Sequence, residues 1–241
     1  MLYLIGLGLN FDSISRRGLE KIQKCKKVYL ENYTVDFPYT KAKLEEVIGK
    51  KIISVGRDFV EGLEIVDEAA KKDVALLVYG SPLTATTHIT LLDEAKKSRV
   101  KTNVIYNASI FDAVARSGLQ LYKFGKISSI PKWDEKQENS YAPDSFMKNV
   151  KENQSIDAHS LLLTDIGLEF SDAIKQLKRA AKNHDVKLNK IVVCQMMGTR
   201  QSRIFYEKIE EFEEQSIKLP YCIIIPGKLH FMEKEVLESF D

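Results

Sequence analysis

The sequence is poor in cysteine, has a single tryptophan and contains no long hydrophobic run. Its three cysteines are far apart and form no Cys-x-x-Cys pair, which argues against a disulfide framework and against a zinc site. No apolar run approaches the length that spans a membrane, and the first residues lack the basic stretch and cleavage site of a secretory signal. We therefore expect a cytoplasmic protein without a membrane partner.

Familiar catalytic motifs are also missing. The sequence contains no P-loop lysine motif, no His-Glu-x-x-His helix and no Gly-x-Ser-x-Gly turn. The histidines stand far apart, and none has a cysteine or carboxylate at metal-ligand spacing, so we expect no metal site. His230 remains a candidate because it follows a predicted strand end. A net charge of +2 neither favours nor excludes a nucleic-acid partner.

Short apolar runs alternate with amphipathic stretches through the first half of the chain. Such alternation predicts an α/β fold with a mostly parallel sheet and right-handed crossovers. The expected strands cover residues 2–5, 28–30, 52–55, 74–79 and 104–106. One expected helix starts near residue 13, and three more cover residues 60–72, 89–97 and 111–117.

The pattern changes after Gly118. We expect strands at 121–130, 160–164, 191–196 and 221–225, helices at 145–151 and 173–183, and a polar helix or extended arm at 200–214. Residues 131–143 are polar and irregular and are expected to form a loop. The sequence therefore predicts two α/β domains, residues 1–118 with a mostly parallel sheet and residues 119–241 with a mixed sheet.

The most informative stretch is the apolar run that ends on Gly80-Ser81-Pro82 and continues into a threonine-rich segment. Open α/β sheets bind ligands at the carboxyl ends of their strands, and a glycine there lets the backbone approach a ligand closely. The alternative is an ordinary strand-to-helix turn with a hydroxyl cap. This segment alone does not separate the two interpretations.

Gly6-Leu7-Gly8 after the first strand suggests a dinucleotide site, but the pattern is incomplete. The fingerprint needs a third glycine where this chain has Phe11, and Glu31 is the nearest acidic residue that could hold a ribose. We therefore interpret the two glycines as a close backbone approach to another ligand or as a tight turn.

Strand ends rich in Gly, Ser and Thr, with no evident nucleophile, suit a reaction in which a cofactor carries the reactivity. Methyl transfer from a sulfonium is such a reaction, because the protein need only align the donor, the methyl carbon and the acceptor. Alignment supplies on the order of 7–11 kcal/mol of a barrier. An amine acceptor must also lose a proton, which a dry pocket favours by disfavouring the charged form.

Several motifs in matching order resemble the diphthine synthase family of the tetrapyrrole methylase superfamily. They are residues 1–9, 85–88, 107–110, 118–125 and 226–230. The resemblance implies two α/β domains with S-adenosylmethionine in the cleft between them, and a homodimer. It also implies methylation of the amino group of a 3-amino-3-carboxypropyl-histidine on translation elongation factor 2, with no direct nucleic-acid partner.

The resemblance further implies the cofactor-binding residues, although it identifies no catalytic base. They are Leu9, Ser81, Thr84, Ser109, Ile110, Thr164, Met197 and Tyr221. The chain departs from the family pattern at Ser81, where the family has aspartate, and at Met196, where it has arginine. Two alternatives stay open: a superfamily methylase acting on a tetrapyrrole or ribosomal RNA, and a degenerate donor-binding protein without turnover.

Overall fold

The computed structural model describes residues 1–133 and 142–240, which fold as two compact units. The first unit is Met1–Ala113 and the second is Val114–Asp241. The domain boundary predicted after residue 118 stays a prediction, and most of the loop predicted over residues 131–143 lies outside the described residues. Within the described part of the chain, no helix is long and apolar enough to cross a membrane.

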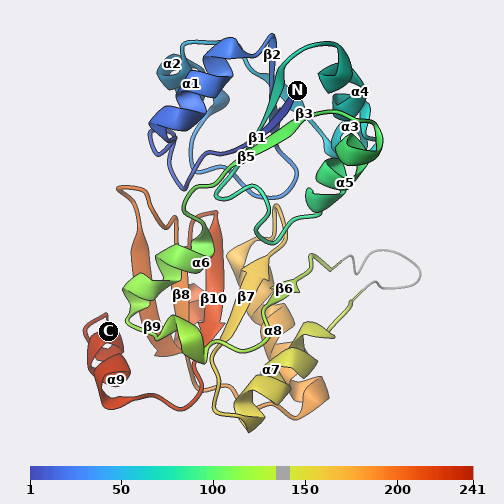
Figure 1. The fold of residues 1–241 in the computed structure, drawn as a ribbon. Helices are drawn as coiled ribbons and strands as arrows, with labels where there is room; N and C mark the ends of the chain where they lie inside the picture. Colours follow the sequence, from blue (N-terminus) through green and yellow to red (C-terminus); the bar gives the residue numbers. More distant parts are fainter. Residues whose placement is uncertain (134–141, 241) are drawn as a thin grey trace. The chain divides into compact units, whose positions relative to one another are not determined.

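The first unit is built on a five-stranded sheet in which every neighbouring pair is parallel, in the order β3-β2-β4-β1-β5 (Figure 1). Its strands are β1 (Leu2–Gly6), β2 (Lys27–Glu31), β3 (Ile53–Val55), β4 (Val74–Val78) and β5 (Thr102–Ile105). All residues of β1 and β4 are buried. Strands covered on both faces are apolar throughout, which is why these two appear in the sequence as unbroken apolar runs.

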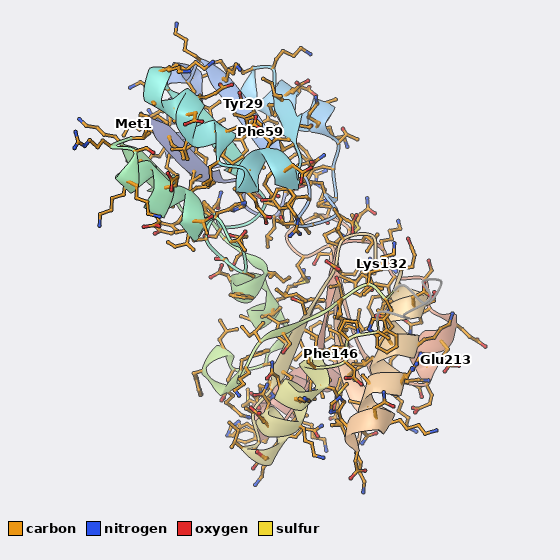
Figure 2. The ribbon with its side chains drawn as sticks, turned by 90° about the vertical axis from the view of Figure 1, so that its right-hand side faces the viewer. Met1, Tyr29, Phe59, Lys132, Phe146 and Glu213 are labelled. Atoms are coloured by element: carbon orange, nitrogen blue, oxygen red, sulfur yellow. The ribbon has the colours of Figure 1, made fainter. Side chains whose placement is uncertain are left out.

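Helices cover both faces of this sheet (Figure 1). One face carries α1 (Arg16–Lys24) and α2 (Lys41–Ile48), and the other carries α3 (Arg57–Glu61), α4 (Glu64–Lys71) and α5 (Ile89–Lys97). Each face has its own apolar core. In the core under α3, α4 and α5 the rings of Tyr29 and Phe59 lie side by side, with centroids 5.0 Å apart (Figure 2). The short helix α6 (Ile110–Ala113) follows β5.

The second unit has a mixed sheet in the order β6-β7-β10-β8-β9. Its strands are β6 (Ser128–Ile130), β7 (Ser160–Thr164), β8 (Lys190–Gln195), β9 (Arg203–Lys208) and β10 (Tyr221–Ile225). Only β6 and β7 pair in parallel. The helices α7 (Phe146–Ser155) and α8 (Phe170–His184) pack on its apolar core, and α9 (Phe231–Glu238) follows β10. The second unit also contains the 3-10 turns η1 (Val114–Ser117), η2 (Leu121–Lys123) and η3 (Glu211–Glu214).

The α/β class and the two strands at 160–164 and 221–225 are confirmed, whereas the single helix predicted over 60–72 is wrong. The helix over 60–72 is broken at Gly62 and Leu63, and Leu63 is left-handed with φ of +67°. The segment 200–214 holds strand β9, which agrees with the extended alternative of its prediction. Helix α2 was not predicted.

The strand predicted over 121–130 is also interrupted. A 3-10 turn, η2, occupies its start, Phe124 forms an isolated bridge with His159, and only Ser128–Ile130 forms a strand of the sheet. The reason lies in Asn153, whose side chain accepts a hydrogen bond from Lys126 N and donates one to Lys126 O, both at 2.8 Å. A side chain therefore takes the place of a neighbouring strand at this point.

Candidate functional site

Five of the predicted cofactor-binding residues lie at one edge of the first sheet. The strands β4, β1 and β5 are adjacent and parallel, so their carboxyl ends meet there. The residues that follow these ends are Leu9 after β1, Ser81 and Thr84 after β4, and Ser109 and Ile110 after β5. In open α/β sheets this is the edge that binds ligands.

The two glycine motifs of the sequence form one structure at this edge. Gly8 N donates to Gly80 O at 3.1 Å, and Gly80 N donates to Gly8 O at 2.9 Å. Both residues have positive φ, +72° and +68°, which favours glycine. A Cβ on Gly6 would lie 2.6 Å from Gly80 O, so the backbones are in contact. The Gly-x-Gly motif is thus explained by packing between two strand ends.

The loop after β5 is fixed to the same place by Asn107. Its side-chain amide donates to Gly6 O at 3.1 Å and to Ser13 O at 3.0 Å. Ser109 follows, and both its N–H and its hydroxyl donate to one carboxylate oxygen of Asp112, at 2.7 and 3.1 Å. The start of α6 is therefore held in a single arrangement beside Gly80.

Leu9 is oriented by an aromatic neighbour. The Tyr79 hydroxyl donates to Leu9 O at 3.1 Å. Burial raises the pKa of the Tyr79 phenol, so the hydroxyl stays protonated and able to donate. The ring of Phe37 packs edge-on against Tyr79, with centroids 5.4 Å apart. This arrangement fixes the backbone that follows β1.

The chemistry of this edge is neutral. The segments 6–10, 79–88 and 107–110 contain no lysine or arginine and offer hydroxyls, backbone groups and apolar side chains. A cationic ligand therefore meets no like charge from these segments. Among the described residues there is no group of three or more His, Cys, Asp or Glu side chains that could hold a metal ion. The edge suits a ligand that brings its own reactivity.

The three remaining predicted residues gather at one edge of the second sheet. Thr164 ends β7, and its hydroxyl donates to Tyr221 O at 2.9 Å. Tyr221 begins β10 and pairs with the last residue of β8, after which Met197 follows. The Tyr221 hydroxyl donates to Leu168 O at 3.0 Å. Met197 and Tyr221 are almost fully buried, at 4% and 5% exposure.

His230 has a structural role. It is the N-cap of α9, where its Nδ1 accepts a hydrogen bond from Met232 N at 3.4 Å. Its own N–H donates to Glu233, a buried carboxylate that also binds Gln120 N, Lys123 Nζ and His159 Nε2. Burial alone would raise the pKa of Glu233, but Lys123 and the other donors outweigh it and hold the pKa at about 2.

Glu31 and His88 gain importance from the structure. Glu31, the last residue of β2, is fully buried, so in this arrangement it is closed to a ribose. His88 is 1% exposed, and its ring contacts the turn that holds Ser81. The contact between His88 and Tyr33 joins residues 55 positions apart in the sequence, so no local sequence pattern signals it.

The chain is similar to known proteins over its whole length. The family model of tetrapyrrole (corrin/porphyrin) methylases matches residues 1–213. Diphthine synthase from Methanocaldococcus jannaschii is 38% identical over 258 residues, which cover 99% of this chain and 98% of the relative. Diphthine methyl ester synthase from Schizosaccharomyces pombe is 35% identical over 271 residues, which cover 100% of this chain and 94% of the relative. A crystal structure of diphthine synthase superposes with a TM-score of 0.87 at 30% identity, covering 99% of this chain and 95% of that one.

Proposed function

The chain belongs to the tetrapyrrole methylase family, and within it to the diphthine synthases, so it is a methyltransferase; we propose that its donor is S-adenosylmethionine. We propose as its acceptor the amino group of the 3-amino-3-carboxypropyl-histidine on translation elongation factor 2, the intermediate of diphthamide biosynthesis. The observation that carries the proposal is similarity to diphthine synthases along the entire chain, beyond the shared fold.

The residues at the first sheet edge fit this donor. S-adenosylmethionine supplies an already activated methyl group, so the protein need not provide a nucleophile or a metal. Ser81, Thr84 and Ser109 offer neutral hydroxyls and backbone groups, and Leu9 and Ile110 offer apolar contact. Because none of them is cationic, they impose no repulsion on a sulfonium. Their task is to bind and align the donor, which lowers the barrier of a reaction between two molecules.

The remaining predictions extend this proposal. Thr164, Met197 and Tyr221 would contact the same donor from the second unit. We further propose that the protein is cytoplasmic, acts as a homodimer and recognises the folded elongation factor without binding nucleic acid directly. Ser81 and Met196 stand where the family has charged residues, and in this structure Met196 is almost fully buried at 6% exposure.

Calorimetric titration with S-adenosylmethionine and S-adenosylhomocysteine tests the donor. We expect micromolar binding of both, followed by methyl transfer to the modified elongation factor, which mass spectrometry detects and counts. Donor binding without transfer would instead support the degenerate donor-binding protein. Transfer to a tetrapyrrole or to ribosomal RNA, with none to the elongation factor, would replace the acceptor but keep the donor.

A further inference from the structure

The turn after β4 is held from two sides. On the strand side, Gly80 pairs with Gly8 as described above. On the helix side, the carbonyl oxygen of Pro82 accepts two hydrogen bonds, from the Thr86 hydroxyl at 3.2 Å and from His88 Nδ1 at 3.0 Å. The proposed donor contacts Ser81 and Thr84 flank Pro82, so their positions depend on where this carbonyl is held.

The backbone inside this turn is strained. Ala85 has φ of +53°, a left-handed conformation that is strained for a residue other than glycine. Such a conformation persists only where its surroundings fix it. The two hydrogen bonds to Pro82 O bridge the bend, because Thr86 and His88 follow Ala85 while Pro82 precedes it. They are therefore suited to hold the strained turn closed.

The His88 ring is itself held in one orientation. Since Nδ1 faces a carbonyl oxygen, it carries the proton in the neutral ring, and Nε2 is left to accept. The Tyr33 hydroxyl lies 3.4 Å from Nε2, and the two rings meet edge-on with centroids 6.4 Å apart. Burial, with Glu31 and Glu61 adding to it, raises the pKa of Tyr33 to about 12, so its hydroxyl remains a donor.

Tyr33 is fixed in turn by the end of β2. Glu31 accepts a hydrogen bond from the Thr34 hydroxyl at 2.6 Å and one from Tyr33 N at 3.5 Å. The Arg57 guanidinium lies over the Tyr33 ring, 5.3 Å from its centroid. A continuous set of contacts thus runs from Glu31 through Tyr33 and His88 to Pro82.

We propose that His88 is a positioning residue for the methyl donor: its Nδ1–H···O bond to Pro82 fixes the turn that presents Ser81 and Thr84, and Tyr33 keeps the ring aligned. His88 acts through Pro82 and does not itself touch the donor. The inference rests on the proposed function, because the ligand of this turn is the donor named there.

Titration of S-adenosylhomocysteine into matched variants tests the role. His88→Leu removes the bond, whereas His88→Asn places an amide N–H near the position of Nδ1 and can still donate to Pro82 O. Lys50→Met is the control. It removes three hydrogen bonds to carbonyls at the end of α1, from Lys50 Nζ to Ile22, Gln23 and Cys25, near the start of β2 and thus at the opposite edge of the sheet.

We expect His88→Leu to weaken binding roughly ten-fold, as the loss of one buried hydrogen bond predicts, and His88→Asn to stay within about three-fold of the unsubstituted protein. Lys50→Met should lower the unfolding temperature and leave the dissociation constant unchanged. Thr86→Val removes the other bond to Pro82 O and should weaken binding several-fold, which provides a second test if His88→Leu does not fold.

Three outcomes would overturn the inference. In the first, the folded His88→Leu protein, or Thr86→Val if His88→Leu does not fold, binds as tightly as the unsubstituted protein. In the second, His88→Asn is as weak as His88→Leu. In the third, Lys50→Met weakens binding as much as either, which would show a general effect of destabilisation. If the unsubstituted protein binds neither donor nor product, the proposed donor fails, and this inference fails with it.

Discussion

At the scale of single residues, glycines decide the shape of the ligand edge of the first sheet, and buried polar side chains hold part of the second unit together. Gly8 and Gly80 adopt left-handed conformations and pair with each other. His159 illustrates the polar part: Gly227 N donates to its Nδ1, so its Nε2 carries the proton that Glu233 accepts. Burial outweighs the carboxylate and lowers the pKa of His159, so the ring stays neutral.

Thr84→Trp tests the donor site at this scale. Thr84 is partly exposed, so we expect the bulky ring to leave the fold intact but to fill space that the donor needs. A steric cost of about 3 kcal/mol corresponds to roughly 100-fold weaker binding. Calorimetry measures the change, and Ser98→Trp, on an exposed residue at the end of α5, is the control. Unchanged affinity in Thr84→Trp would contradict the placement of the donor.

Glu233→Gln tests the buried network of the second unit. Removal of one charge from this cluster should cost about 3 kcal/mol of unfolding free energy, because Lys123 and three other donors lose their anionic acceptor. Denaturant unfolding measures the loss. Glu235→Gln, on an exposed residue of the same helix, should cost almost nothing. Equal losses in the two variants would disprove the role of the network.

The same carboxylate makes stability depend on acid pH. The pKa of Glu233 is about 2 in the folded protein, against an ordinary value of 4.5. The ionised carboxylate therefore stabilises the fold fully at pH values above 4.5. The contribution should fall as pH drops from 4.5 towards 2 and should be absent in Glu233→Gln. Unfolding curves across this range, compared between the two proteins, measure it; parallel curves would contradict the assignment.

At the scale of elements, the ends of helices and strands explain both the successes and the failures of sequence-based prediction. The strands at 160–164 and 221–225 are apolar runs with clear limits, and their bounds were predictable. The break at Leu63 was not, because its neighbours keep helical apolar spacing. The five strand-end residues came from the resemblance to diphthine synthases, and parallel topology explains why they meet at one edge of the sheet. The role of His88, by contrast, depends on Tyr33, which lies 55 residues away.

Gly118→Ala tests how α9 packs against the turn that follows η1. Gly118 has φ of +83°, and an added Cβ would lie 2.4 Å from Val236 Cγ1 on α9. Gly49→Ala is a matched control, because Gly49 has φ of +69° but no atom within 4 Å of the added Cβ. We expect about 1 kcal/mol of destabilisation for Gly49→Ala, from conformation alone, and at least about 2 kcal/mol more for Gly118→Ala. Similar values in urea unfolding would show that the contact with α9 relaxes freely.

At the scale of the whole molecule, the chain forms two units, each with its own hydrophobic core. The proposed contacts are five residues of the first unit and three of the second. If both groups contact the donor, binding must stabilise both units, although each has its own hydrophobic core. Stabilisation by a ligand follows its concentration relative to the dissociation constant and reaches about 2.7 kcal/mol at a 100-fold excess.

Trp133 reports on the second unit alone. It is the single tryptophan of the chain, and its indole N–H donates to Pro143 O at 3.0 Å. We expect saturating S-adenosylhomocysteine to raise the unfolding temperature seen by tryptophan fluorescence by about 2–4 °C per kcal/mol of stabilisation. Adenosine, which lacks the amino-acid part of the donor, is the comparison ligand. A shift in circular dichroism without one in fluorescence would confine the donor to the first unit.

The pairing of Gly8 with Gly80 also has a consequence for solvent exchange. Both glycines lie outside the strands, where amide protons are ordinarily replaced by deuterium within seconds, yet each N–H is held by the carbonyl of the other. These two amides should therefore exchange as slowly as those of β1 and β4. Deuterium exchange at these two amides, followed by NMR, would show whether the ligand edge of the first sheet opens during turnover, and it needs no label on the protein surface.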